Sequence, residues 1–436
     1  KFKKLDLKPL GDSYTQGFQV VAPFKNNQSP ILEIKKDNKS IKKFRYGVDF
    51  KEDMLNFSVS DITLSSEDNL NIFPSSISFK KGGNLFLLYV TKEDNFKFRS
   101  SFVHESPVSF AIAITEDVYH EIISSIKDNS EISIALPYTL KTTEVYNVVG
   151  KIEGKDKNNP PLILTAHFDH LGSDCLGNIY SGALDNASGT SFLLELASYL
   201  KSLPTPNRDI IFVALNGEEF GLIGSNEFAS QYKDTLKDAK VINFDMIGAE
   251  NFPITFMRGE KNIETESALL TDLENVCEKL NLESNVKYED SSDHASFVNN
   301  GFDALTITHS DTSRIHTPDD TIEFISKDAI SSAYDLCNEY LKSDGFINAK
   351  VLLIESLVRQ EISDEYTMLK DGMLFNFIPR YVMLPEESEG YNTALKILSD
   401  YYMKEPSYFL MARDLLYKDC FMALPLSYIR EEGEML

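Results

Sequence analysis

Five short clusters lie between positions 167 and 321, and each contains His, Asp or Glu side chains that can bind divalent metal ions. They are HFDH at 167–170, ALDNASG at 183–189, NGEEFG at 216–221, NFDMIG at 243–248 and IHTPDDT at 315–321. Taken singly, each acid has an ordinary explanation: Asp185 could cap a helix, and Glu218 and Glu219 suit a helix N-terminus. Because five of the seven histidines also fall between 167 and 316, the combination favours a metal site.

The residue types suit a centre with two metal ions. Zinc accepts imidazole nitrogens and carboxylate oxygens. Two ions a few ångströms apart need roughly five protein ligands, and a carboxylate can bridge them because it has two oxygens. A further carboxylate that binds no metal is needed to take a proton from water and pass it on. Ligand type alone would also allow cobalt or manganese, and the histidines favour zinc.

The elements that must position these residues alternate between strands and helices from about residue 148 onwards. Buried strands are predicted at Leu162–Ala166, Ile210–Leu215, Val241–Phe244 and Ala304–Thr308, and helices at Thr190–Leu200, Gly221–Tyr232, Ile263–Leu280 and Lys327–Leu341. Such alternation predicts an α/β fold with a mostly parallel central sheet flanked by helices. Active sites of these sheets lie at the carboxyl ends of the strands, where four of the clusters fall.

The remainder of the chain has a different pattern. Residues 1–21 lead into the catalytic domain, which is predicted to resume at 146 and to end at 345. Residues 22–145 predict a small β-rich inserted domain, because short β-rich runs are separated by turn residues, with one helix near Glu116–Ile126. Residues 346–436 predict a helical C-terminal extension of unknown role, cut by prolines.

Composition excludes several classes of protein. The 436 residues carry a net charge of −24, from 43 basic and 67 acidic residues, so phosphate backbones would repel the chain and nucleic-acid binding is not expected. The longest uncharged runs are too short for a membrane-spanning helix. The four cysteines form no CxxC pair, which argues against a cysteine-built zinc site. The chain starts with Lys and has no apolar signal segment there, which suggests a removed leader or a fragment.

The motifs HxD, DNASG, NGEExGLxGS, FDMIG and HTPDDT, in this order, resemble the M28 family of dinuclear zinc aminopeptidases. The resemblance covers about residues 146–345 and implies two Zn²⁺ per chain. It also implies that His167 and Asp245 complete one zinc, that Glu219 and His316 complete the other, and that Asp185 bridges them, with a cis peptide bond to Asn186. Glu218 would be the general base and then the general acid.

The same resemblance implies roles around the metals. Asp169 would orient His167. The segment SDHASF at 292–297 is similar to a family segment near the substrate pocket, so Met246, His294 and Phe297 are predicted to line that pocket. His170 is predicted to form hydrogen bonds in a loop, and the following TPDDT favours His316 over His309 as the ligand.

The flanking regions resemble family features more loosely. Pieces of the segment 22–145 resemble a protease-associated domain, which would serve as a lid or a substrate gate and would suit a secreted or cell-envelope protein. A helical extension after the catalytic domain occurs in relatives that dimerise, so residues 346–436 could mediate a homodimer.

The leading hypothesis is a metallopeptidase that removes N-terminal residues from peptide substrates. One alternative is a carboxypeptidase or dipeptidase of the same superfamily, in which arginines such as Arg258 or Arg314 would bind the free carboxylate. A single-zinc glutaminyl cyclase is a second alternative, although His167 and Asp245 would then have no metal to hold. A metal-free receptor on the same fold is a third, and it should have lost ligands that this chain retains.

Overall fold

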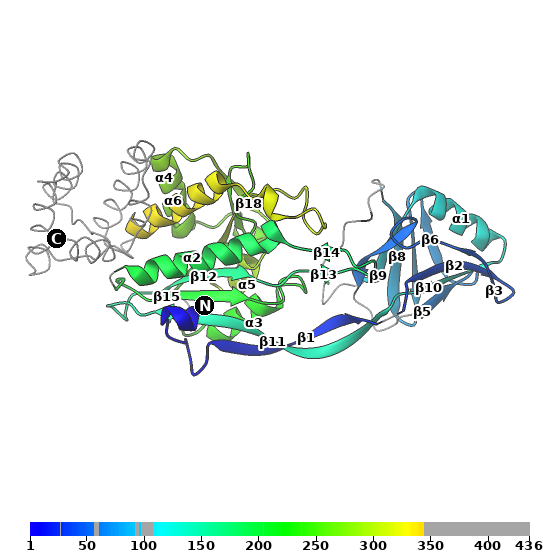
Figure 1. Ribbon diagram of the computed structural model, residues 1–436, viewed down its shortest axis with the longest axis horizontal. Helices are drawn as coiled ribbons and strands as arrows, with labels where there is room; N and C mark the ends of the chain where they lie inside the picture. Colours follow the sequence, from blue (N-terminus) through cyan, green and yellow to red (C-terminus); the bar gives the residue numbers. More distant parts are fainter. Residues whose placement is uncertain are drawn as a thin grey trace, which may run out of the picture.

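The computed structural model describes residues 1–343, apart from 27, 56–60, 92–95, 97–107, 204 and 237. An α/β body and a smaller β-rich body are joined by a long two-stranded ribbon (Figure 1). The predicted helical extension at 346–436 lies outside the described residues. Within those residues, no helix combines the length and apolar character needed to cross a membrane.

The α/β body is built on one eight-stranded sheet with the order β1-β11-β15-β12-β16-β19-β17-β18. In that order the strands span Thr15–Lys25, Tyr138–Ile152, Ile210–Leu215, Leu162–His167, Lys240–Phe244, Asp303–Thr308, Ile254–Arg258 and Ser284–Tyr288. The four central strands, from β15 to β19, are parallel. The β1–β11 ribbon joins one side of them antiparallel, and β17 and β18 run the opposite way on the other side.

Helices cover both faces of this sheet. Every residue of β12 and β15 is buried, which is why these strands appear in the sequence as continuous apolar runs. One face of the sheet shares a hydrophobic core with the helices α2 (Gly189–Ser202), α4 (Ala268–Leu280) and α6 (Lys327–Ser343). The helices α3 (Ile223–Tyr232) and α5 (His294–Asn299) pack on the other. The predicted α/β fold with a helix-flanked central sheet is therefore confirmed.

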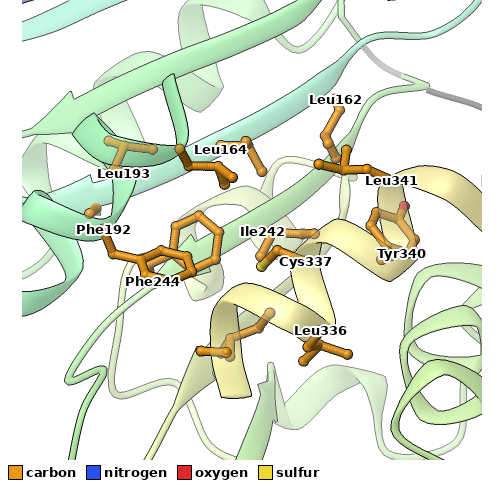
Figure 2. Close-up of a cluster of buried hydrophobic side chains, with 14 of the residues drawn as sticks. Leu162, Leu164, Phe192, Leu193, Ile242, Phe244, Leu336, Cys337, Tyr340 and Leu341 are labelled. Atoms are coloured by element: carbon orange, nitrogen blue, oxygen red, sulfur yellow. The ribbon is translucent and has the colours of Figure 1, made fainter. Parts of the chain in front are cut away.

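Figure 2 shows the core under the first helical layer. Phe192 of α2 packs against Phe244 of β16, with ring centroids 4.8 Å apart. Leu336 and Tyr340 of α6 lie in the same cluster and are fully buried. This packing fixes the position of α2 relative to β16. One polar cluster lies at the start of α2, and another lies at the end of β16.

The sequence predicted some boundaries wrongly. The helix expected from Ile263 begins five residues later, at Ala268, because the Ser267 hydroxyl caps it by accepting the Leu270 N–H at 3.0 Å. Ile263 itself is exposed. The strands β17 and β18 and the short helix α5 were not predicted, since their polar and apolar residues give no clear period.

The described residues of the β-rich body form two sheets and one helix. Its four-stranded sheet has the order β3-β2-β10-β5, and its five-stranded sheet has the order β4-β9-β8-β7-β6. The strands span Ile31–Lys36 (β2), Lys39–Lys43 (β3), Phe50–Leu55 (β4), Asp61–Leu64 (β5), Leu70–Phe73 (β6), Ser76–Lys81 (β7), Asn84–Val90 (β8), Val108–Ile114 (β9) and Glu131–Ala135 (β10). The predicted helix is confirmed as α1 (Glu116–Lys127), and it packs on the core that the two sheets enclose.

The ribbon belongs to both bodies. The predicted domain boundaries at 21/22 and 145/146 fall inside β1 and β11, which pair continuously from Thr15 with Val148 to Lys25 with Tyr138. The chain therefore enters and leaves the β-rich body along adjacent strands. The likeness of this body to a protease-associated domain stays a prediction.

Gly154, just after β11, tests how tightly the sheet edge is packed. A methyl group on this residue would lie 2.2 Å from the backbone carbon of Arg208. We expect Gly154→Ala to lower the free energy of unfolding by roughly 1–3 kcal/mol, because backbone atoms cannot move aside as a side chain can. Chemical denaturation would measure this. Gly11→Ala is the matched control, since nothing lies within 4 Å of the added carbon; equal losses in both variants would contradict the packing argument.

Candidate metal centre and active site

The polar clusters meet at the carboxyl edge of the four parallel strands. His167 is the last residue of β12, Asp245 directly follows β16, and Glu218 and Glu219 lie in the turn after β15. Asp185 lies in a distorted helical turn, Ala183–Ser188, that opens α2, and His316 lies in the loop after β19. Parallel strands end on the same side of a sheet, and this brings together side chains that are up to 149 positions apart.

Asp185 lies between the two histidines. Its Oδ1 is 3.3 Å from Nε2 of His167, and its Oδ2 is 3.3 Å from Nε2 of His316. Each carboxylate oxygen therefore faces a different imidazole. This is the arrangement that a bridging ligand between two metal ions requires.

Each histidine also faces a second carboxylate. Nε2 of His167 lies 3.4 Å from Oδ1 of Asp245, and Nε2 of His316 lies 3.2 Å from Oε2 of Glu219. The structure thus brings all five predicted ligands into two half-sites that share Asp185. Donor atoms of His167, Glu218 and Asp245 lie within 4.8 Å of one another, as do those of His170, Asp185 and Glu219.

Both outer carboxylates have one oxygen engaged by the protein and one left free. Ser292 donates to Oδ2 of Asp245 at 2.7 Å, and Asn243 donates in turn to the Ser292 hydroxyl at 2.9 Å. His170 Nδ1 is 2.8 Å from Oε1 of Glu219. The oxygens that face His167 and His316, Oδ1 of Asp245 and Oε2 of Glu219, have no hydrogen-bond partner although they are buried.

These unpartnered atoms fit a metal site. Nε2 of His167 is also buried without a hydrogen-bond partner. Leaving buried polar atoms unpaired is costly unless something binds them. The three atoms converge with Asp185, and their types are ligands of zinc. The residues present therefore fit two divalent cations.

The charges of the site are strongly coupled. Burial by itself would lower the pKa of His316. The carboxylates of Asp185 and Glu219 have a larger opposite effect, and the pKa rises to about 10. In the same way burial is outweighed at His167, whose pKa is raised well above its ordinary value by Asp245 and Glu218. Burial raises the pKa of Glu218 well above the usual range for a glutamate, although His167 opposes this. The site thus holds an excess of acid groups that need positive charge.

Asp169 fixes the turn that carries the two glutamates. Its Oδ1 accepts the backbone N–H of Glu218 at 3.3 Å, and its Oδ2 accepts that of Glu219 at 3.2 Å. Nδ1 of His167 lies 3.2 Å from the Asp169 backbone oxygen and 3.8 Å from its Oδ1. Asp169 therefore contacts His167 as the sequence predicts, and it also holds the backbone of Glu218, which the sequence did not indicate.

Two further side chains hold the Asp185 turn, and sequence reasoning gave them no role. Asp320 accepts the backbone N–H groups of Leu184 at 2.8 Å and Asp185 at 3.0 Å. Asn186 donates to the Phe244 backbone oxygen and accepts the N–H of Met246 at 3.2 Å. Their positions inside the DNASG and TPDDT clusters were the available signal. The peptide bond between Asp185 and Asn186 is cis, as the family resemblance implied.

The predicted pocket residues lie at different depths. Met246 is largely buried, packs in one cluster with Leu184 and directly follows Asp245 in the sequence. His294 is fully buried, and its ring nitrogens contact Thr306 Oγ1 at 2.8 Å and the Glu289 backbone oxygen at 2.9 Å.

Phe297 is fully buried in the core on the α3 side, between Phe228 and Phe302. This corrects the prediction that Phe297 lines a pocket, because its side chain packs inside the core. His294 likewise uses both ring nitrogens inside the protein.

Comparisons with known proteins agree with this fold. The family model described as "Peptidase family M28" matches residues 147–341. "Aminopeptidase YwaD" of Bacillus subtilis (strain 168) is 30% identical over 248 residues, which is 53% of this chain and 51% of that protein. "Glutamate carboxypeptidase 2 homolog" of Caenorhabditis briggsae is 33% identical over 124 residues, 27% of this chain and 15% of that protein. The chain thus spans about half, or less, of these curated relatives.

Solved structures share the fold at lower identity. "Aminopeptidase from Aneurinibacillus sp. strain AM-1" has a TM-score of 0.54 at 20% identity and covers 75% of this chain and 83% of its own. "BSAP, a zinc aminopeptidase from Bacillus subtilis" has a TM-score of 0.52 at 19% identity, covering 79% and 86%. Residues 147–341, which carry the site, thus match the model of peptidase family M28, and the solved structures share the fold.

Proposed function

We propose that this protein is a zinc aminopeptidase with a dinuclear centre built by His167, Asp185, Glu219, Asp245 and His316. The observation that carries the proposal is Asp185, whose two oxygens face His167 and His316 at equal distances of 3.3 Å. His167 and Asp245 would hold one ion, and Glu219 and His316 the other. When bound, the two ions would supply an activated water and polarise the scissile carbonyl.

Glu218 has the position and environment of a general base. It lies within 4.8 Å of His167 and Asp245 yet is not needed to complete either half-site. In this proposal its carboxylate accepts a proton from water and returns it to the leaving amine nitrogen. Burial raises its pKa, which makes it able to hold that proton between the two steps. Asp169 keeps the Glu218 backbone in place through its hydrogen bonds to two consecutive N–H groups.

Cleavage at the N-terminal end of a peptide fits the charges better than cleavage at the C-terminal end. The described part of the site is rich in carboxylates, which suit a substrate's free ammonium group. Arg258 is buried and donates to the backbone oxygens of Asn262 and Thr265, and Arg314 stacks on the Phe324 ring at 3.6 Å. Both arginines named in the carboxypeptidase alternative therefore have partners inside the protein.

The other two alternatives are supported less well. A single-zinc cyclase would leave Oδ1 of Asp245 and Nε2 of His167 buried and unpaired. In a metal-free receptor, buried polar atoms would stay unpaired at both half-sites, which is unfavourable. Secretion or a cell-envelope location and dimerisation through residues 346–436 stay predictions.

Replacing Glu218 should separate metal binding from catalysis. We expect Glu218→Gln to lower kcat roughly 10²–10⁴-fold, because the amide cannot accept the proton, while the zinc content stays at the wild-type value. Release of 4-nitroaniline from leucine-4-nitroanilide, together with elemental analysis, would measure both. Glu227→Gln, on the exposed face of α3, is the control. A near-normal kcat for Glu218→Gln would remove Glu218 from the mechanism.

Replacing Asp185 should instead change the metal content. We expect two zinc ions per wild-type chain and fewer than two in Asp185→Asn, because an amide lacks the second anionic oxygen that a bridge needs. Asp234→Asn, an exposed acid beyond α3, should keep both ions. One zinc ion per wild-type chain would favour the glutaminyl cyclase alternative. A wild-type chain without zinc would favour the receptor alternative.

Blocking the substrate amine tests the direction of cleavage. Leucine-4-nitroanilide should be hydrolysed by the zinc-loaded protein, and chelation should abolish its hydrolysis until zinc is returned. N-acetyl-leucine-4-nitroanilide should not be hydrolysed, because acetylation converts the amine into an uncharged amide that the carboxylates do not attract. Equal rates on both compounds would contradict an aminopeptidase.

A further inference from the structure

A hairpin over residues 170–182 links the metal centre to the β-rich body. It contains the short strands β13 (Gly172–Ser173) and β14 (Ile179–Tyr180), which pair antiparallel. In Figure 1 the hairpin reaches from the α/β body towards the β-rich body. Its base contacts Glu219 and the Asp185 turn, and its tip contacts the β-rich body.

The base of the hairpin is packed against two metal-ligand residues. His170 begins it, and its Nδ1 lies 2.8 Å from Oε1 of Glu219. Because an ionised carboxylate only accepts hydrogen bonds, this nitrogen is the donor. Gly182 ends it, and a methyl group there would lie 2.4 Å from the Asp185 backbone oxygen and 2.6 Å from the His170 ring. A shift of the hairpin base would therefore move groups that contact Glu219 and Asp185.

The tip of the hairpin is held by Asp174, which is fully buried. Its Oδ1 accepts the N–H groups of Leu176 at 2.9 Å and Asn178 at 3.0 Å, so the carboxylate shapes the turn. Its Oδ2 is 3.1 Å from Nζ of Lys51, a residue of β4 in the β-rich body that is only 1% exposed. The Lys51 ammonium also donates to the hydroxyl of Tyr180 in β14.

Lys51 and Asp174 form a buried ion pair between the two bodies. Burial raises the pKa of Asp174, but hydrogen bonds from Asn178 and Lys51 lower it below its ordinary value, so the carboxylate is ionised. Separating the pair would deprive each buried charge of this opposite charge, which is strongly unfavourable. Lys25, at the end of β1, adds a hydrogen bond to the Asp174 backbone oxygen at 2.8 Å.

A second contact joins the same two regions. Phe220 directly follows the ligand residue Glu219, and its side chain packs against the core of the β-rich body. Cys175, at the hairpin tip, packs against that core as well. The β-rich body thus contacts both the hairpin and the turn that carries Glu219.

We propose that Lys51 is a positioning residue for the active site: it holds Asp174, the hairpin 170–182 transmits this constraint, and His170 fixes Glu219. The hydrogen bond from His170 engages Oε1 and leaves Oε2 facing His316 at 3.2 Å. The β-rich body therefore helps to set which oxygen of Glu219 is offered to a metal. This inference rests on the proposed function of the metal centre.

The test compares Lys51→Met with Lys35→Met in the full-length, zinc-loaded protein. Lys35 is a matched control, because it lies in the same body and pairs there with Glu33 at 3.1 Å. We expect Lys51→Met to lower kcat for leucine-4-nitroanilide and to speed the loss of one of the two zincs to a chromophoric chelator, each by roughly 10–100-fold. KM should change little, since the substrate-binding groups stay in place. Lys35→Met should match the wild type.

A double-mutant cycle identifies the route of the effect. His170→Ala should lower kcat and hasten zinc loss, and His170→Asn should restore much of both because its amide nitrogen can donate in the place of Nδ1. Adding Lys51→Met to His170→Ala should change little further if both act on one route. Losses that simply add, or an unchanged kcat and zinc release in folded Lys51→Met, would overturn the inference.

Two measurements keep this test decisive. If Lys51→Met does not fold, Asp174→Asn breaks the same ion pair without changing the size of the side chain and must give the same losses for the inference to stand. A wild-type protein without zinc or activity would refute the proposed function. Normal wild-type activity with unaffected Lys51→Met and Asp174→Asn variants would refute only the role of Lys51.

Discussion

The burial of several carboxylates around two histidines is the constraint on which the structure of the site depends. Asp185, Glu219 and Asp245 are all buried within a few ångströms of His167 or His316. Like charges repel strongly where water is excluded, so such a group is stable only if positive charge balances it. The two histidines balance part of it, as the raised pKa of each indicates. The remaining unpaired oxygens suit cations.

The architecture holds these side chains against their repulsion through backbone contacts. Asp320 holds the N–H groups of the Asp185 turn, Asp169 holds those of the glutamate turn, and Asn186 joins the Asp185 turn to the segment after β16. The strands beneath are covered on both faces by helices, so their ends cannot easily move. Rigid strand ends and hydrogen-bonded turns together give the preorganised site that a two-ion centre needs.

The β-rich body is connected to this site by more than the covalent ribbon. The buried Lys51–Asp174 pair holds the hairpin whose first residue, His170, contacts Glu219. Phe220, which packs against the core of the β-rich body, directly follows Glu219 in the sequence. A body attached only through β1 and β11 would be free to bend about the ribbon. The additional contacts link this body to the turn that carries Glu219, one of the proposed metal ligands.

The five proposed ligand residues came from the family resemblance, whereas the sequence pattern by itself determined the parallel strands and most of the helices. It could do so because fully buried strands are continuous apolar runs, and because strand ends in such a sheet converge at one edge. Helix α4 was misplaced at its start and β17, β18 and α5 were missed, because capping by Ser267 and mixed polarity are not visible in an apolar period.

Only the tertiary structure decided the finer arrangement of the site. It placed Phe297 in the core, although the residue's position in the SDHASF segment suggested a pocket. It also assigned His170 to Glu219 and Lys51 to Asp174, pairs that are 49 and 123 positions apart. The sequence determines which groups can bind metals or carry charge. Which oxygen each carboxylate presents depends on hydrogen bonds between distant segments, and these exist only once the chain has folded.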